Sequence, residues 1–229
     1  MKRLNILIVA LLTCIFVFSS TVFATTYDNT NVSTLSKDII DKANQGNADA
    51  QNQINIYFSN LMNAANNGDP VAINKLQNLD CFDEEKVKAV FGNVKIKPGE
   101  TIKHYFDDGS AISVRNNSQV GTNGVIGIAS TLLSAEKTWF VGIAYAKITT
   151  FVDLSSTRYV AHINSAWGVG LALASELSDV NTVIVVQDGN PSVVQSSAVW
   201  TIPTPLSTKT CLVRYNVDTA GILTETFSY

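Results

Sequence analysis

The sequence has few of the residues from which enzymes and metalloproteins usually build their sites. Its 229 residues include two histidines, and charged residues make up 15% of the chain. A zinc site needs three or four ligands at characteristic spacings, and no helical histidine pair or comparable pattern accompanies His104 or His162. We therefore expect neither a metal ion nor a cofactor.

Long apolar runs are also scarce, and the most extended one lies at the N-terminus. Two basic residues precede an apolar run at 4–18, and Val22 and Ala24 supply the small side chains that signal peptidases recognise. The run is shorter than the roughly 20 residues that cross a bilayer. We expect residues 1–24 to be a signal peptide cleaved near Ala24, leaving a secreted protein with no stable membrane anchor.

Positive charge is scarce as well. Residues 1–24 contain two of the 16 basic residues and none of the 19 acidic residues, so the mature chain has a net charge of −5. Its lysines and arginines are scattered singly along the sequence, whereas a nucleic-acid interface needs them clustered. The sequence therefore predicts no nucleic-acid partner, and we expect an extracellular protein, peptide or glycan ligand.

Only two cysteines remain in the mature chain, because Cys14 lies in the leader. In an oxidising compartment Cys81 and Cys211 could pair and connect the helical part of the chain to its strand-rich part. Two buried, unpaired thiols are the alternative, and the sequence does not decide between them.

Helix signals dominate residues 36–92, after a polar lead-in at 25–35 that we expect to be flexible. Ser36, Asp69 and Asp83 each stand where a helix N-cap is expected, and a proline follows Asp69 at the first helical position. This punctuation predicts a small region of short helices.

The periodicity changes from helical to alternating after this region, and residues 93–229 predict an antiparallel β domain. The turn sequence at 107–110 indicates a hairpin. Residues 138–146 alternate as one strand, which would place Trp139 and Tyr145 together in the core. Overall, the sequence predicts an α+β fold, with a small helical N-terminal region followed by an antiparallel β-sandwich or barrel-like domain.

A segment at 166–177 is ambiguous, because its apolar residues could align on a helix although glycines interrupt it. Trp167 lies in this segment beside a glycine, and it is the tryptophan that we expect to be exposed. With His162 and Arg158 on the preceding strand, Trp167 forms our candidate binding set.

The sequence is compatible with three functions. The first is a non-catalytic binding or interaction module, which the absence of an assembled catalytic signature favours. The second is a secreted hydrolase whose site forms only in the fold, with His162 or His104 as the base and Asp153 as a candidate carboxylate. The third is a membrane-damaging toxin.

Overall fold

The computed structural model describes residues 34–92, 94–118, 131–157, 160–173, 175–202, 207–218 and 222–225. The expected signal peptide and nearly all of the lead-in lie outside these ranges. Arg158 also lies outside them. Every structural statement below concerns the described residues.

Helices come first, and polar caps set where they begin. They are α2 (Lys37–Asn44), α3 (Ala48–Asn66), α4 (Pro70–Gln77), the 3-10 helix η1 (Asp80–Phe82) and α5 (Glu84–Phe91). The side chains of Ser36, Asp69 and Asp83 accept hydrogen bonds from the first turns of α2, α4 and α5, as their positions in the sequence predict.

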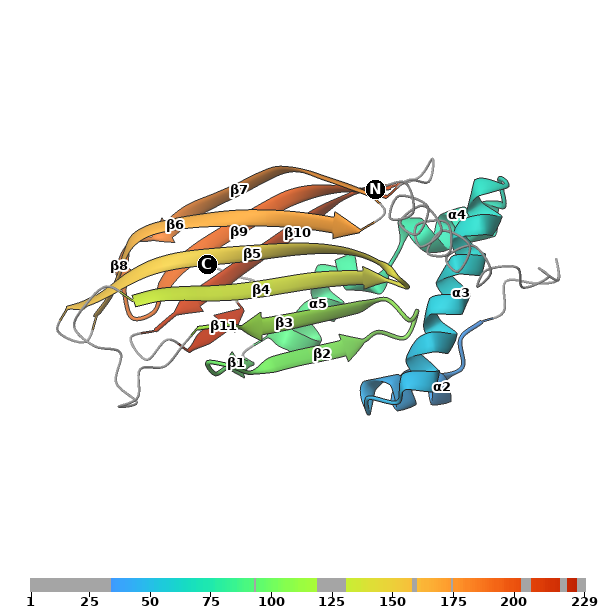
Figure 1. Ribbon diagram of the computed structural model, residues 1–229, viewed down its shortest axis with the longest axis horizontal. Helices are drawn as coiled ribbons and strands as arrows, with labels where there is room; N and C mark the ends of the chain where they lie inside the picture. Colours follow the sequence, from blue (N-terminus) through green and yellow to red (C-terminus); the bar gives the residue numbers. More distant parts are fainter. Residues whose placement is uncertain are drawn as a thin grey trace, which may run out of the picture. The chain divides into compact units, whose positions relative to one another are not determined.

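The rest of the described chain forms strands. They are β1 (Lys95–Ile96), β2 (Thr101–Tyr105), β3 (Ala111–Asn116), β4 (Thr131–Val141), β5 (Ala144–Thr157), β6 (Val160–Leu173), β7 (Glu176–Val186), β8 (Asp188–Gly189), β9 (Ser192–Ile202), β10 (Ser207–Val217) and β11 (Leu223–Glu225). One antiparallel sheet has the order β1-β11-β10-β9-β7 and the other the order β2-β3-β4-β5-β6-β8. The fold is therefore α+β, as predicted, with one sheet curled into a half-barrel (Figure 1).

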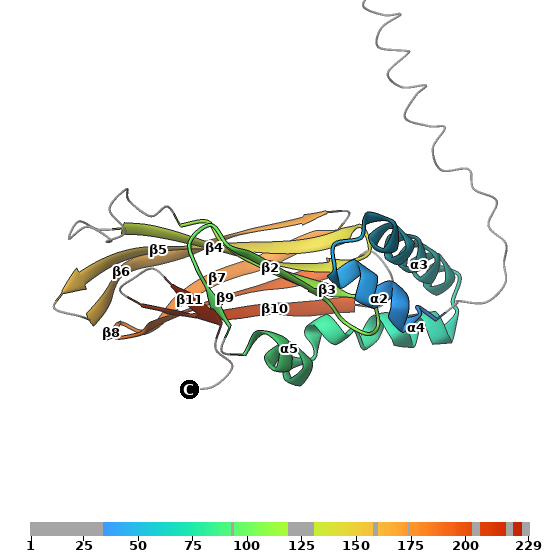
Figure 2. The same ribbon diagram turned by 90° about the horizontal axis from the view of Figure 1, so that it is seen from below.

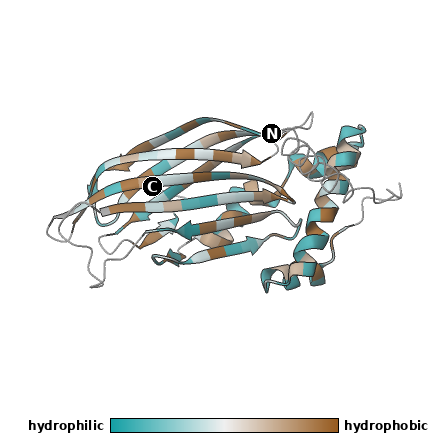
Figure 3. Cartoon of the chain, viewed as in Figure 1, coloured by the Kyte–Doolittle hydropathy of each residue, from teal (hydrophilic) through white to brown (hydrophobic). Residues whose placement is uncertain are grey.

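The two sheets pack together through alternating apolar side chains. Cys211, Val213 and Tyr215 of β10 are each at most 1% exposed, and the intervening residues face away from the core. Trp139 of β4 and Trp200 of β9 are also buried. Figure 3 shows the same alternation of apolar and polar positions along the long strands. One face of β10 is therefore buried between the sheets.

Helices α2, α3 and α4 gather at the end of the sheets where the β2–β3 and β4–β5 turns lie (Figures 1 and 2). Gly109 and Gly142 make this approach possible, since both have a positive φ and both lie against α3. A Cβ on Gly142 would stand 2.6 Å from the Cβ of Phe58, which belongs to α3. These two glycines therefore allow α3 to pack directly over the two hairpin turns.

The prediction of one strand over 138–146 is wrong. Gly142 and Ile143 form a tight turn, and β4 pairs with β5 through Val141 opposite Ala144. A two-residue turn shifts the alternation, so that Trp139 faces the core while Tyr145 lies opposite Phe140 on the outer face. Sequence alternation alone did not reveal this reversal.

In the ambiguous segment at 166–177, residues 166–173 form the end of β6 and residues 176–177 begin β7, so no helix forms in its described part. Its glycines alternate with outward-facing residues and lie on the inward face of β6 together with alanines, and β7 packs against that face. A Cβ on Gly170 would lie 2.4 Å from Leu177 and 2.6 Å from Val180. The glycines that weaken a helix here provide room for a neighbouring strand.

Candidate functional site

A cavity of about 270 Å³ opens where α3 meets the β2–β3 and β4–β5 hairpins. Its floor is apolar, with Ile54 of α3 fully buried beneath it. The side chains around it that can recognise a ligand are those of Gln51, Asn55, Lys103, Tyr105, Phe140 and Tyr145. Because a 150 Å³ apolar cavity can hold benzene, this volume suits one ring with its substituents.

Lys103 is the cation of this cavity. Its ammonium donates a hydrogen bond of 2.6 Å to the hydroxyl of Tyr105 and stands 4.5 Å from the ring centres of both Tyr105 and Phe140. Cation–π contacts of this kind are worth about 0.5–1 kcal/mol at exposed sites. They hold the charge in place without neutralising it. No carboxylate of the described residues forms an ion pair with Lys103.

Amide and aromatic side chains complete the cavity. The carboxamide of Asn55 makes no hydrogen bond with the described part of the chain, and it remains available to a ligand. Phe140 and Tyr145 lie opposite each other on β4 and β5, with ring centres 6.1 Å apart. The cavity thus combines one fixed cation, an amide and aromatic rings.

The residues of this cavity were not predicted from the sequence. The turn at 107–110 was recognised, but Lys103 and Phe140 come from different hairpins, and α3 supplies Asn55 from a distant part of the chain. A single sequence has no local signal for the packing of a helix over two turns. The shifted alternation at Tyr145 further concealed the aromatic pair.

His162 lies near one end of β6, where β8 pairs with that strand. Its Nδ1 contacts the carboxylate of Asp188, and its Nε2 lies 3.5 Å from the amide of Gln187. The expected carboxylate, Asp153, instead accepts a hydrogen bond of 3.5 Å from Asn164. The carboxylate that contacts His162 is therefore that of Asp188 and not that of Asp153. The pairing of β6 with β8 brings Asp188 opposite His162, and the sequence contains no signal for this pairing.

A nucleophile for His162 does not emerge from this arrangement. Ser155 lies opposite His162 on β5, yet its hydroxyl donates to Asn164 at 3.4 Å. The site therefore has a histidine and a carboxylate in contact, with the nearest cross-strand hydroxyl turned to another partner.

Trp167 is 43% exposed, which confirms the prediction of its exposure. It stacks on Phe151 of β5, with ring centres 5.4 Å apart and an angle of 16° between the ring planes. Trp167 follows His162 by five positions along β6, a span of about 16 Å. The structure therefore does not bring these two candidates into one site, and the third, Arg158, is not among the described residues.

His104 has an ordinary structural environment. Its ring packs edge-to-face on Phe106, with the centres 5.1 Å apart. Partial burial lowers the pKa of His104, while Asp107 acts weakly in the opposite direction. The neutral ring is therefore favoured, and no acid–base partner contacts it among the described residues.

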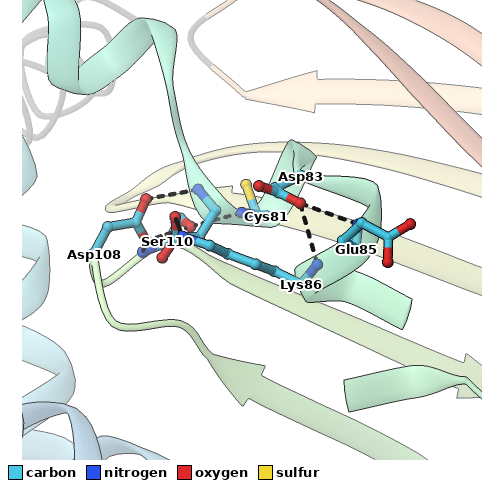
Figure 4. A network of polar contacts seen from close by, with 7 residues as sticks. Cys81, Asp83, Glu85, Lys86, Asp108 and Ser110 are labelled. Carbon is cyan, nitrogen blue, oxygen red and sulfur yellow. Dashed lines mark hydrogen bonds and ion pairs between the residues drawn. The ribbon is translucent and has the colours of Figure 1, made fainter. Parts of the chain in front are cut away.

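A polar network joins η1 to the β2–β3 turn (Figure 4). The carboxylate of Asp108 accepts hydrogen bonds from the backbone N–H groups of Asp80 and Ser110, both at 2.8 Å. The hydroxyl of Ser110 donates to Asp108 and accepts from the N–H of Cys81 at 3.0 Å. Burial raises the pKa of Asp108, although these hydrogen bonds oppose the rise. Each group in the network has a structural partner.

Comparison of the chain with protein-family models, curated proteins and solved structures gives no match. Within the described ranges, no cluster of three or more histidine, cysteine or acidic side chains could hold a metal ion. The helices described here are too short or too polar to cross a bilayer. The function must therefore be inferred from the geometry of the site.

Proposed function

We propose that the protein is a secreted, non-catalytic binding module, and that its ligand places a carboxylate against Lys103 in the cavity between α3 and the two hairpins. The observation that supports this most directly is the position of the Lys103 ammonium, held between two aromatic rings without a carboxylate of the described chain beside it. A ligand carboxylate would complete this arrangement, because charge-assisted hydrogen bonds are stronger than neutral ones.

The rest of the cavity selects the body of the ligand. Phe140 and Tyr145 offer aromatic surface for a flat or ring-shaped group, and Asn55 offers an amide that can donate and accept hydrogen bonds. Acidic sugar rings and acidic peptide side chains both combine a carboxylate with a small body. The volume limits what enters to about one sugar residue or one side chain.

A titration with defined probes tests this function. We expect D-galacturonate to perturb the side-chain amide signals of Gln51 and Asn55 in ¹H–¹⁵N NMR spectra, whereas uncharged D-galactose perturbs them much less. A second probe, N-acetylaspartate, distinguishes a peptide-type ligand from a glycan. The variant Lys103→Met should lose most of the response, and Lys147→Met, at a half-buried ion pair with Glu136, should keep it. Failure of both acidic probes to move these signals would contradict the proposal.

The contact between His162 and Asp188 favours a hydrolase as the second candidate function. A histidine held by a carboxylate is two-thirds of a hydrolytic triad. The variant His162→Ala separates the two functions, since it should abolish hydrolysis of a general ester such as p-nitrophenyl acetate while leaving the galacturonate response intact.

A further inference from the structure

A lysine and a glutamate meet in the interior between the two sheets. Lys137 of β4 and Glu225 of β11 each have side chains that are 2% exposed, and the Lys137 ammonium contacts Oε1 of Glu225. The two residues belong to different sheets and are 88 positions apart in the sequence. The contact therefore exists only in the folded chain.

Apolar and aromatic groups surround the pair. The Lys137 ammonium stands 5.1 Å from the ring centre of Trp139, which is itself buried. Removing two charges from water carries a large desolvation penalty, which their mutual attraction offsets only when every remaining polar atom is satisfied. That condition fails here, because Oε2 of Glu225 is buried without a hydrogen-bond partner.

A second buried oxygen adjoins this pair. Tyr215 lies directly opposite Glu225 in the β10–β11 pairing, and its hydroxyl is also buried without a hydrogen-bond partner. Burial, and then the charge of Glu225, raise the pKa of Tyr215, so the phenol keeps its proton. An amine, a carboxyl group and a phenolic proton are thus gathered where water is excluded.

We propose that Lys137 and Glu225 condense to form an intramolecular amide bond that joins β4 to β11. A proton first passes from the ammonium to the carboxylate, which leaves a neutral amine and a neutral carboxylic acid. The amine nitrogen attacks the carboxyl carbon, a nitrogen–carbon bond forms, and a carbon–oxygen bond breaks. The oxygen leaves with two protons as one water molecule, and no oxidant or other reactant is consumed. The carboxylic acid supplies one of these two protons, and the amine nitrogen supplies the other.

Two physical effects favour the reaction. Holding the two groups in contact replaces an encounter in solution, and well-oriented intramolecular reactions reach effective concentrations of about 10⁵–10⁸ M. Condensation also replaces two buried charges and one unsatisfied oxygen with a neutral amide. The folded interior therefore favours a product that is not favoured between free groups in water.

The mass of the purified, folded protein tests the proposal. The intact polypeptide should be lighter than its sequence by the mass of one water molecule, also after denaturation. Trypsin should then fail to cleave after Lys137, and the digest should contain residues 116–147 joined to residues 215–229. An intact mass equal to the full sequence, with residues 116–137 and 215–229 recovered separately, would overturn the proposal.

Two variants assign the mass loss to these residues. Glu225→Ala should have the full mass of its sequence, even if it folds poorly, because the mass is measured on the denatured chain. Lys147→Ala removes a half-buried lysine that pairs with Glu136 at 3.6 Å, and it should keep the loss of one water. A Glu225→Ala chain that still lacks one water would assign the loss to another site and sink the proposal.

Discussion

At the scale of single residues, buried polar side chains connect parts of the chain that the sequence places far apart. Asp108 lies in a hairpin turn, where acidic residues are common, and the sequence predicts only that turn. In the structure its carboxylate also accepts from the backbone of Asp80, which starts η1. The sequence predicted the local role of this residue but not its long-range one, because the second role depends on packing.

We expect Asp108→Asn to lower the free energy of unfolding by about 1–3 kcal/mol, because its amide N–H₂ would face a backbone N–H that now donates to a carboxylate oxygen. Urea denaturation at neutral pH measures this loss. Asp107→Asn is the matched control, since Asp107 is exposed. Equal losses in the two variants would show that the network contributes nothing specific.

The pH dependence of stability gives a second readout of the same variant. The pKa of Asp108 is raised in the folded state, so the folded chain binds this proton more tightly than the unfolded chain. The contribution of the group is therefore complete below the unfolded pKa and is lost as the pH rises through the folded pKa. Asp108→Asn should abolish this component of the pH profile.

At the scale of secondary-structure elements, helix-capping residues predicted the structure better than the alternation of apolar and polar residues did. The capping residues Ser36, Asp69 and Asp83 located the starts of α2, α4 and α5, because a cap depends on a few adjacent residues. Alternation failed at Gly142, where a two-residue turn joined two strands without a strong turn sequence. The contact between β6 and β7 could not be predicted either. The small side chains of β6 that face β7 are explained only by the close approach of that strand.

The inward face of β6 supplies a prediction at this scale. We expect Gly170→Ala to destabilise the fold, because the added Cβ would lie within 2.6 Å of atoms of both Leu177 and Val180. Overpacking of this kind costs about 1–3 kcal/mol, more than the 0.4–1 kcal/mol or so that alanine can gain by restricting the unfolded chain. Thermal unfolding compares it with Val169→Ala, at an exposed neighbouring position, which should change little. A Gly170→Ala protein as stable as the wild type would show that β7 can move away.

At the scale of the whole molecule, the fold class was predictable and the candidate site was not. The change from helical to alternating periodicity is spread over many residues, so the predicted fold class stays correct even where the bounds of one strand are wrong. The cavity at Lys103 depends on one helix crossing two turns, and three separate segments supply its side chains. The choice between paired and free cysteines belongs to this scale as well, because it depends on how the helical region meets a sheet.

Cys81 and Cys211 come from regions that pack together. Phe82, beside Cys81, lies with its ring centre 6.1 Å from that of Trp200, and Lys209 of β10 donates a hydrogen bond to the backbone carbonyl of Gln77. Cys211 follows two positions after Lys209, and both cysteines are buried as free thiols in the structure. Burial raises the pKa of Cys81 well above its usual value and that of Cys211 to about 12. At neutral pH the folded thiols therefore stay protonated, and only a thiolate can exchange with a disulfide.

This chemistry predicts when the cysteines can pair. If the protein is exported, we expect a bond between Cys81 and Cys211 to form during folding in the presence of a disulfide donor, whereas the folded, reduced protein should remain reduced under the same conditions. Counting maleimide adducts in denaturant measures both states, with none expected on the exported protein and two on the protein that folded reduced.

The bond should add roughly 4–5 kcal/mol to the free energy of unfolding by the chain-entropy estimate for a long loop. Cys81→Ala/Cys211→Ala is the control that should lose this increment. Two adducts on the exported protein would contradict this prediction. They would show that Cys81 and Cys211 remain buried thiols even when an oxidant is present throughout folding.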